Sequence, residues 1–437
     1  MMTPALALAA IVCARTVTLD QAERAAETQA PTVREAQANA TAGQARTEVA
    51  RAPALPQVKI EGAYERATGN RRQRPGRTTE VNNSWTTYNW FEGQATASQL
   101  LWDFGLTVNR WRAAQARAVA LNDAARAAVL EALSTVRGAY FNARAAKELI
   151  VVAKTTLANQ ERHLAQITGF VGAGTRPDID LAQARAGTAN ARVAMIRAQT
   201  GYEVARAELN QAMGQAGDID YDVAEQTLPA IPGETGPVGP LIDEAIKARP
   251  DLAALDAEVR AQELAARAAR GAYWPRFDLI AGAVDSGIQF QKEIRRDNFN
   301  QPVPYGGMAW NVWGGVQLTW DVFQGLQTRG QVREADALIQ SVRARRDGLV
   351  NEVWVAVQRA SAAVRAAHES LVAAEEALVA ANQRLRLADG RYSAGVGSII
   401  ELADAELGAA NAGAQRVTAE FTLSTARADL LLALGRR

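Results

Sequence analysis

The chain has 437 residues, a formal net charge of +1 and 22% charged residues, with alanine the most frequent residue. Near-zero net charge without blocks of like charge gives no indication of a nucleic-acid partner. A single cysteine, Cys13, excludes an internal disulfide and a thiolate metal cluster. The sequence has no phosphate-binding glycine loop, no metal-spaced His/Cys cluster and no paired catalytic residues on loops, so it predicts no enzyme, no cofactor and no metal site.

The N-terminus begins with a short apolar run, Ala5–Ala14, followed by Arg15. This run is too short to span a bilayer but fits the core of a signal peptide, so we predict one over residues 1–14, with its basic first part missing. The alternative is that Cys13 is the lipidated first residue of the mature chain, although Val12 is bulky where a small residue is usual. No run of 18 apolar residues occurs, so no transmembrane helix is predicted.

The first half of the chain mixes helices with strands. Short helical patterns over 18–30 and 31–52 end at two prolines. Residues 57–66 then alternate, with Val58, Ile60 and Tyr64 on one side, which predicts a strand. A polar, basic loop over 67–91 leads to a second strand near 93–102. From 107 to 214 a heptad pattern predicts a helical hairpin that turns at the glycines near residue 174.

The second half repeats this plan after a linker, 228–240, that holds four prolines and three glycines. We predict strands near 276–285 and 311–320, and a second helical hairpin over 326–434. Its apolar positions between 360 and 431 recur with alternating spacings of three and four, which is the seam of a coiled coil. Most of them are alanine, so the helices approach closely but bury little area per turn.

Several motifs recur at nearly constant distances. GFVGAGTRPDIDLAQA from Gly169 matches GRYSAGVGSIIELADA from Gly390, and ARAELNQAMG from Ala205 matches ARADLLLALG from Ala426, both pairs at an offset of 221 residues. LPQVKIEGA from Leu55 matches WPRFDLIAGA from Trp274 at an offset of 219 residues, since 274 − 55 = 219. We therefore predict a tandem duplication, with structural repeats over 15–227 and 241–437. His163 and His368 do not correspond under this offset, and we place both on solvated helix faces.

Tryptophans gather around the predicted strands. Seven of the nine lie within or beside them: Trp85, Trp90, Trp102, Trp274, Trp310, Trp313 and Trp320. Ordinary aromatic enrichment in strands is one explanation, and the aromatic girdle of a membrane barrel is the sharper one. Four strands cannot close a barrel, because the smallest transmembrane barrels have about eight. If these strands enter a membrane, several copies of the chain must share one barrel.

This combination resembles the TolC family of outer-membrane efflux ducts. The resemblance covers nearly the whole mature chain, and its most specific parts are RPDL at Arg249, QLTWDVFQG at Gln317 and RYSAGVGSIIELADA at Arg391. It implies a membrane β-barrel joined to a long α-helical barrel, with twelve strands from a homotrimer in contact with outer-membrane lipid. It also implies a location in the outer membrane with a periplasmic extension. The implied partners are a periplasmic membrane-fusion adaptor protein and an inner-membrane transporter of the RND, ABC or MFS class.

The family resemblance also implies a narrow periplasmic aperture with acidic side chains beside a tyrosine. The matching residues are Asp180, Tyr392, Glu401 and Asp404. It further implies that the hairpin turns contact the adaptor, at Gly172, Gly174, Thr175, Gly395, Gly397 and Ser398. Glu401 stands where aspartate is more usual, and Gly397 where some members carry arginine. A second explanation for the acids is that carboxylates favour the first turn of a helix, where the helix dipole stabilises them.

The function expected from this resemblance is an outer-membrane exit duct for efflux or type I secretion. The competing class is a periplasmic coiled-coil adaptor or scaffold without a channel. Such a protein would explain the hairpins, but not four strands bordered by tryptophans. The cargo, whether drug, metal ion or protein, is left open by the sequence.

Overall fold

The computed structural model describes residues 15–68, 87–217, 219–296 and 299–437. The predicted signal peptide with Cys13 and most of the predicted loop 67–91 lie outside them. In the first half the elements are β1 (Arg15–Val17), α1 (Leu19–Gln29), α2 (Pro31–Arg51), β2 (Gln57–Thr68), β3 (Thr87–Trp102), α3 (Leu106–Gly172), α4 (Asp178–Ala212) and β4 (Tyr221–Val223). In the second half they are α5 (Val238–Ala248), α6 (Pro250–Gly271), β5 (Arg276–Arg296), β6 (Pro302–Thr319), α7 (Gln327–Ser393) and α8 (Ile399–Leu434).

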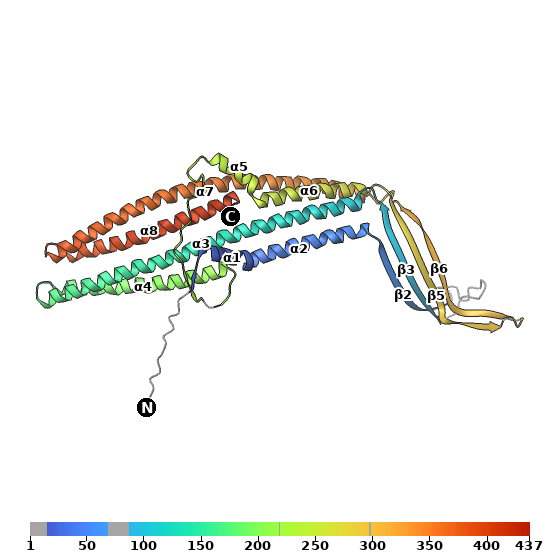
Figure 1. The fold of residues 1–437 in the computed structure, drawn as a ribbon, viewed down its shortest axis with the longest axis horizontal. Helices are drawn as coiled ribbons and strands as arrows, with labels where there is room; N and C mark the ends of the chain where they lie inside the picture. The colour runs from blue at the N-terminus through green and yellow to red at the C-terminus, as the bar shows by residue number, and fades with distance from the viewer. Residues whose placement is uncertain (1–14, 69–86, 218, 297–298) are drawn as a thin grey trace, which may run out of the picture. The chain divides into compact units, whose positions relative to one another are not determined.

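The chain forms two compact units, and each draws on both halves of the sequence. The hairpin unit consists of Met1–Ala40, Leu121–Leu255 and Arg345–Arg437, and the strand unit of Thr41–Ala120 and Asp256–Ala344. Figure 1 shows α3 beside α4 and α7 beside α8, each pair as an antiparallel hairpin. The compact units therefore do not coincide with the predicted repeats over 15–227 and 241–437, which stay a prediction from the sequence.

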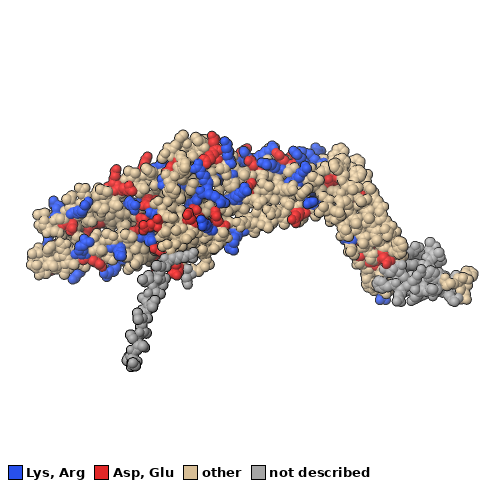
Figure 2. Space-filling model, in the orientation of Figure 1, with Lys and Arg blue, Asp and Glu red and all other residues tan. Residues whose placement is uncertain are grey.

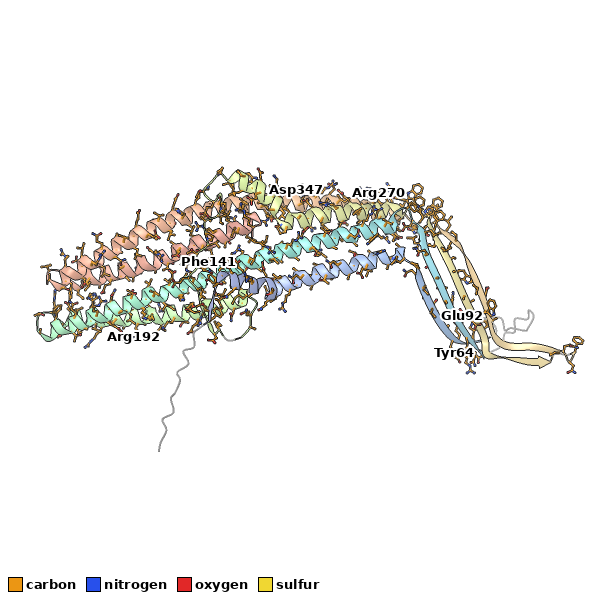
Figure 3. All side chains as sticks on the ribbon, in the orientation of Figure 1. Tyr64, Glu92, Phe141, Arg192, Arg270 and Asp347 are labelled. Carbon is orange, nitrogen blue, oxygen red and sulfur yellow. The ribbon has the colours of Figure 1, made fainter. Side chains whose placement is uncertain are left out.

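The core of the hairpin unit lies in two apolar clusters around the middle of the helices. One cluster packs Val353 and Val357 of α7 against Leu430 of α8 and Ala245 of α5. The other packs α3 and α4 against α1 and β4, and Phe141 in it is marked in Figure 3. β1 pairs with β4 in parallel, so the first described residues are tied to the segment after α4.

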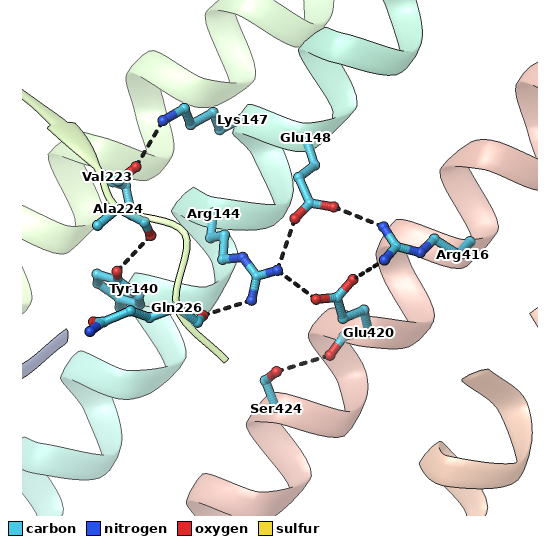
Figure 4. Close-up of polar contacts among 10 residues, drawn as sticks. All are labelled: Tyr140, Arg144, Lys147, Glu148, Val223, Ala224, Gln226, Arg416, Glu420 and Ser424. Atoms are coloured by element: carbon cyan, nitrogen blue, oxygen red, sulfur yellow. Dashed lines mark hydrogen bonds and ion pairs between the residues drawn. The ribbon is translucent and has the colours of Figure 1, made fainter. Parts of the chain in front are cut away.

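The segment between the halves is bound to the helices through its backbone carbonyls and through the buried carboxylate of Glu234, which Arg427 of α8 contacts at 2.7 Å. Tyr140 donates its hydroxyl hydrogen to the carbonyl of Ala224 at 2.7 Å, and Arg144 donates to the carbonyl of Gln226 at 2.6 Å (Figure 4). Further along, Arg427 of α8 donates to the carbonyl of Leu228 at 3.0 Å. The predicted linker 228–240 thus lies against the hairpins, and its last residues begin α5.

The strand unit contains a four-stranded antiparallel sheet in the order β2-β3-β5-β6. β5 reaches Arg296 and β6 starts at Pro302, so both strands are longer than the predicted 276–285 and 311–320. Pairing continues past a register shift between Gly287 and Lys292, through residues that are too polar for an alternating apolar pattern to reveal. Backbone hydrogen bonds, which do not depend on side-chain type, hold this extension.

The sheet exposes a broad apolar surface. On β2, Val58, Ile60 and Tyr64 alternate along the strand with exposed fractions of 73%, 81% and 59%. On β6 the exposed alternate residues are Trp310, Val312, Val316 and Leu318. On the face that Figure 2 draws, the described strands are mostly uncharged, whereas the helices carry both signs of charge. A sheet with these side chains uncovered lacks the apolar partner that a soluble sheet packs against.

Cross-strand aromatic contacts shape the sheet locally. Tyr64, marked in Figure 3, lies against Phe91 of β3 with ring centroids 5.2 Å apart. Gly282 of β5 is paired with Trp313 of β6, and the indole lies across the glycine. Within the described residues, no helix is both long and apolar enough to cross a membrane.

The structure corrects the prediction that both histidines lie on solvated faces. His368 is exposed, but His163 is only 7% exposed and lies 3.2 Å from Glu406. Gln160, a polar residue of α3 one turn before His163, donates to the other oxygen of Glu406 at 2.5 Å. The carboxylate that both residues contact lies 246 residues from Gln160. The local pattern of α3 therefore could not reveal it.

We expect Gly282→Ala to destabilise the sheet. A Cβ at this position would lie 2.5 Å from Cζ2 of Trp313, so the indole must move from its place. Overpacking of this kind costs about 1–3 kcal/mol of unfolding free energy. Urea titration followed by tryptophan fluorescence measures it. Gly62→Ala in β2 is the matched control, because nothing lies within 4 Å of a Cβ there; equal effects of both substitutions would contradict the role given to the Trp313 contact.

Candidate functional site

The candidate site lies where the two helix hairpins end. The turn between α3 and α4 begins with the last residue of α3, Gly172, and Gly174 adopts a positive φ of 72° there. The backbone amide and the hydroxyl of Thr175 both donate to the carbonyl of Phe170, at 3.0 and 2.8 Å. These bonds satisfy a carbonyl that the end of the helix leaves free.

The turn between α7 and α8 closes more tightly. Gly395 has a positive φ of 81°, and a Cβ on Gly397 would lie 2.9 Å from the backbone nitrogen of Tyr392. Backbone on one side of the turn therefore touches backbone on the other, and only glycine fits. Ser398 then begins α8 by accepting a hydrogen bond from the amide of Glu401 at 3.1 Å.

Tyr392 joins the second hairpin to the first. Its side chain is 1% exposed, and its hydroxyl donates to Oδ2 of Asp180 at 3.4 Å. Arg176 donates to the Tyr392 carbonyl at 3.2 Å, and its guanidinium lies 4.6 Å from the centre of the tyrosine ring. Burial, followed by the negative charge of Asp180, raises the pKa of Tyr392 above its ordinary value. Two of the predicted aperture residues, Asp180 and Tyr392, are thus in contact within one chain.

The other two predicted aperture residues lie on α8 with different surroundings. Glu401 is half-buried and pairs with Arg391, with Nε and Oε1 3.2 Å apart. Asp404 is exposed. Arg391 and Arg176 are functional candidates that the sequence analysis did not select, although both sit directly beside selected positions. They supply positive charge close to the predicted acidic residues.

An apolar cluster packs beside these contacts and includes the Tyr392 side chain. It contains Ile167 of α3, Ala184 of α4, Ala388 of α7, and Leu402 and Ala405 of α8. Side chains from all four helices therefore meet beside the turns. Gln166 of α3 also donates to the hydroxyl of Ser393, the last residue of α7, at 3.2 Å.

A ring of ion pairs joins the hairpins further from the turns (Figure 4). Arg144 of α3 contacts Glu148 at 3.0 Å and Glu420 at 2.5 Å, and Arg416 of α8 contacts the same two carboxylates at 3.2 and 2.8 Å. Between this ring and Glu406 lies a cavity of about 570 Å³ lined by α3, α7 and α8. Because each carboxylate lies between two guanidiniums, the ring is balanced in charge.

In the part of the chain that the structure describes, no group of three or more His, Cys, Asp or Glu side chains is placed to hold a metal ion. The arrangement at the hairpin ends therefore consists of charged groups, a buried tyrosine and hydrogen bonds that join the helices.

Comparison with known proteins gives a family match in both halves. The family model described as outer membrane efflux protein matches residues 23–215 and 241–436. The chain is 26% identical over 355 residues to the outer membrane protein OprJ of Pseudomonas aeruginosa, covering 80% of this chain and 70% of OprJ. It is 28% identical over 413 residues to the protein CyaE of Bordetella pertussis, covering 93% and 81%. The solved CmeC outer membrane channel of Campylobacter jejuni has the same fold, with a TM-score of 0.77, 17% identity and coverage of 95% and 85%.

We expect Arg176→Gln to loosen the turn between α7 and α8. Glutamine keeps a donor but removes the guanidinium from the face of the Tyr392 ring, a loss of about 1 kcal/mol at a half-buried site. Amide hydrogen exchange in residues 390–398 should then speed up by about fivefold. The matched control is Arg185→Gln, an exposed arginine on the same helix as Asp180. Unchanged exchange in the Arg176 variant would show that the two hairpins are held by other contacts.

Proposed function

We infer the function of this chain from its family: it belongs to the outer membrane efflux proteins. It is an outer-membrane protein with a periplasmic helical extension, and it serves efflux or secretion. Within that role, we assign to it the exit duct of a tripartite efflux or type I secretion system. It conducts substrate passively from a periplasmic adaptor and an inner-membrane pump to the exterior.

The exposed, open-edged sheet carries this proposal. β2 and β6 are the edge strands of the sheet, so the outer backbone groups of each lack a partner strand within the described residues. In hydrocarbon such unpaired groups cost several kcal/mol each, and only a closed barrel removes them. Three copies of the chain would supply twelve strands, with Ile60 and Leu318 among the lipid-facing residues. A periplasmic adaptor or scaffold, the alternative reading, has no use for this apolar face.

The partners follow from the duct role. A homotrimer closes the barrel, a periplasmic membrane-fusion adaptor protein contacts the hairpin turns, and an inner-membrane transporter of the RND, ABC or MFS class supplies the energy. The exposed turn residues available to the adaptor include Gly174, Thr175 and Gly395. No step in this role requires an enzyme activity, because the pump performs the energy-consuming work.

The aperture residues take two tasks in this proposal. Asp180 and Tyr392 hold the hairpins together within a protomer, since they are in contact. Asp404 and Glu401 face the pathway and set its preference for cations. In three copies the negative charge of Asp404, which is exposed, adds up around one axis. The positive charges of Arg176 and Arg391 moderate this field, so the mouth is less acidic than its carboxylates alone suggest.

We expect arginine at lipid-facing positions to impair assembly. Ile60→Arg or Leu318→Arg places a charge in hydrocarbon, which costs about 2–4 kcal/mol near the midplane. The measurement is the yield of heat-sensitive trimers in detergent-extracted outer membrane. Lys59→Arg is the control, because Lys59 lies on the opposite side of the same strand and already carries a charge. Normal trimers from both arginine variants would contradict the facing assigned to β2 and β6.

We expect neutralisation of the aperture acids to change conduction in planar bilayers, which is the test of the duct itself. The Glu401→Ala/Asp404→Ala double variant should lower the cation-to-anion permeability ratio by about threefold and raise conductance, because rings of carboxylates concentrate and hold cations. Glu376→Ala, an exposed acid on α7, is the control. An unchanged permeability ratio would mean that these acids only begin a helix, and absence of any conductance from the wild-type trimer would contradict the duct.

A further inference from the structure

A second polar cluster joins the hairpins and plays no part in the aperture. Gln160 and His163 come from α3, Asp389 from α7 and Glu406 from α8. His163 and Glu406 are each 7% exposed, so both ionisable groups are almost removed from solvent. Buried ionisable groups carry a large free-energy penalty unless they are neutral or fully hydrogen-bonded. Their presence in an alanine-rich, largely apolar seam needs a physical account.

The geometry leaves room for one hydrogen between the two groups. Nε2 of His163 lies 3.2 Å from Oε1 of Glu406, and Nδ1 lies 3.8 Å from Oδ1 of Asp389. The amide of Gln160 donates to the other oxygen of Glu406 at 2.5 Å. Oε1 of Glu406 and Nδ1 of His163 have no hydrogen-bond partner among the described residues. A proton on the glutamic acid would be donated to Nε2, and the imidazole would then present its own N–H to Asp389.

The surrounding charges favour holding that proton. From α7, Asp389 faces the histidine and places negative charge near both groups. From α3 itself, Arg162 acts on His163 in the opposite sense. From α4, the packed residues are Gly187 and Thr188, which contact Gln160 and carry no charge. A neutral imidazole has one N–H, so if both Glu406 and Asp389 were ionised, His163 could donate to only one of the two carboxylates.

The acid–base properties agree with this geometry. Burial raises the pKa of Glu406 to about 7; the Gln160 hydrogen bond partly offsets this and the charge of Asp389 adds to it. Burial lowers the pKa of His163 below 6.5, against the pull of Asp389. Below pH 7 the packed pair therefore holds one proton, and it loses this proton as the pH rises through about 7. The second proton, which would charge the imidazole beside a neutral acid, binds only at lower pH.

We propose that this single proton, shared between Glu406 and His163, fastens the second hairpin to the first, and that its loss at mildly alkaline pH lets α8 separate from α3. The cluster adjoins the apolar cluster at the turns, through neighbours such as Ala405 and Ala388. Separation would therefore start at the hairpin ends. The latch depends on the proposed function in one respect only, which is that these helices form the wall of a duct.

The direction of the pH effect follows from the two states of Glu406. A group whose pKa is higher when packed favours packing fully below its exposed pKa, and loses that contribution as pH rises through the packed value. With an ordinary pKa of 4.5 when exposed and about 7 when packed, the packed-to-separated ratio falls by about tenfold between pH 6 and pH 8.5. Below pH 6.5 protonation of His163 begins to oppose packing, so the latch is tightest in mildly acidic solution.

The test measures separation directly, in the purified full-length oligomer. Ala184→Cys places a thiol in the apolar cluster between the hairpins, where it is 7% exposed, and Cys13→Ser leaves it as the only thiol. Alkylation by N-ethylmaleimide then requires separation, and its rate is proportional to the separated fraction. The same thiol is also measured in a Glu406→Gln background, which mimics the protonated acid. Dividing the first rate by the second removes the pH dependence of the thiol reaction itself. We expect the ratio of the two rates to rise by about tenfold from pH 6 to pH 8.5.

The control is Glu376→Gln, an exposed acid on α7, which should leave the wild-type pH response intact. If Glu406→Gln does not assemble, Glu406→Leu serves as the reference, because it also cannot ionise. A rate ratio that stays constant across this pH range overturns the latch. Alkylation does not depend on conduction, so this experiment tests the latch separately from the duct. A constant rate ratio in a protein that conducts ions contradicts only the latch, and a changing rate ratio in a protein that does not conduct contradicts only the duct.

Discussion

The open edges of the sheet β2-β3-β5-β6 are the constraint on which the remaining structure depends. A strand edge can stay unpaired in water, but in hydrocarbon it cannot, so in the proposed duct the edge strands find their missing partners in other copies of the chain. That proposed association would also bring the hairpins of several copies together. Features of the hairpins that look incomplete in one chain, such as Val379 and Leu407 left exposed on α7 and α8, become intelligible as surfaces for those copies.

Alanine-rich seams set the second condition. Alanine allows close approach but buries little apolar area, so one hairpin gains only a modest free energy from packing on the other. Polar contacts occur at intervals along this weak seam: the Arg144–Glu420 ring, the Gln160–Glu406 contact and the Tyr392–Asp180 bond. Such bonds depend on geometry and protonation more sharply than apolar contacts do. The seam is therefore held in part by interactions that a small change in position can weaken.

Much of this architecture could be predicted because its signals are local. Alternation at Val58 and Ile60, the heptads of α7 and α8, and the glycine turn at Gly395 each act over a few residues. The resemblance to the TolC family is confirmed by the family match over 23–215 and 241–436. The extension of β5 to Arg296 was missed because backbone pairing there has no apolar pattern.

The polar contacts between hairpins could not be predicted for a different reason. His163 was placed on a solvated face because its partner Glu406 comes from the other half of the chain and has no repeat relation to it. Arg176 and Arg391 were overlooked because an arginine beside a turn carries no local signal of what it touches. The predicted aperture residues, in contrast, came from the family resemblance. The sequence did not reveal that two of them, Tyr392 and Asp180, are in contact, because they lie 212 residues apart in the chain.

The backbone attachment of the segment between the halves has a consequence for how this protein can diverge. Tyr140, Arg144 and Arg427 each donate to a carbonyl oxygen of the segment, which every residue type provides, and Arg427 also contacts the buried carboxylate of Glu234. Its exposed side chains, among them Glu225 and Thr227, are therefore free to change while the attachment persists. Substitutions at such exposed positions change the surface chemistry at this level of the molecule and leave the path of the segment in place. A substitution of Glu234, in contrast, takes the carboxylate partner from the Arg427 guanidinium.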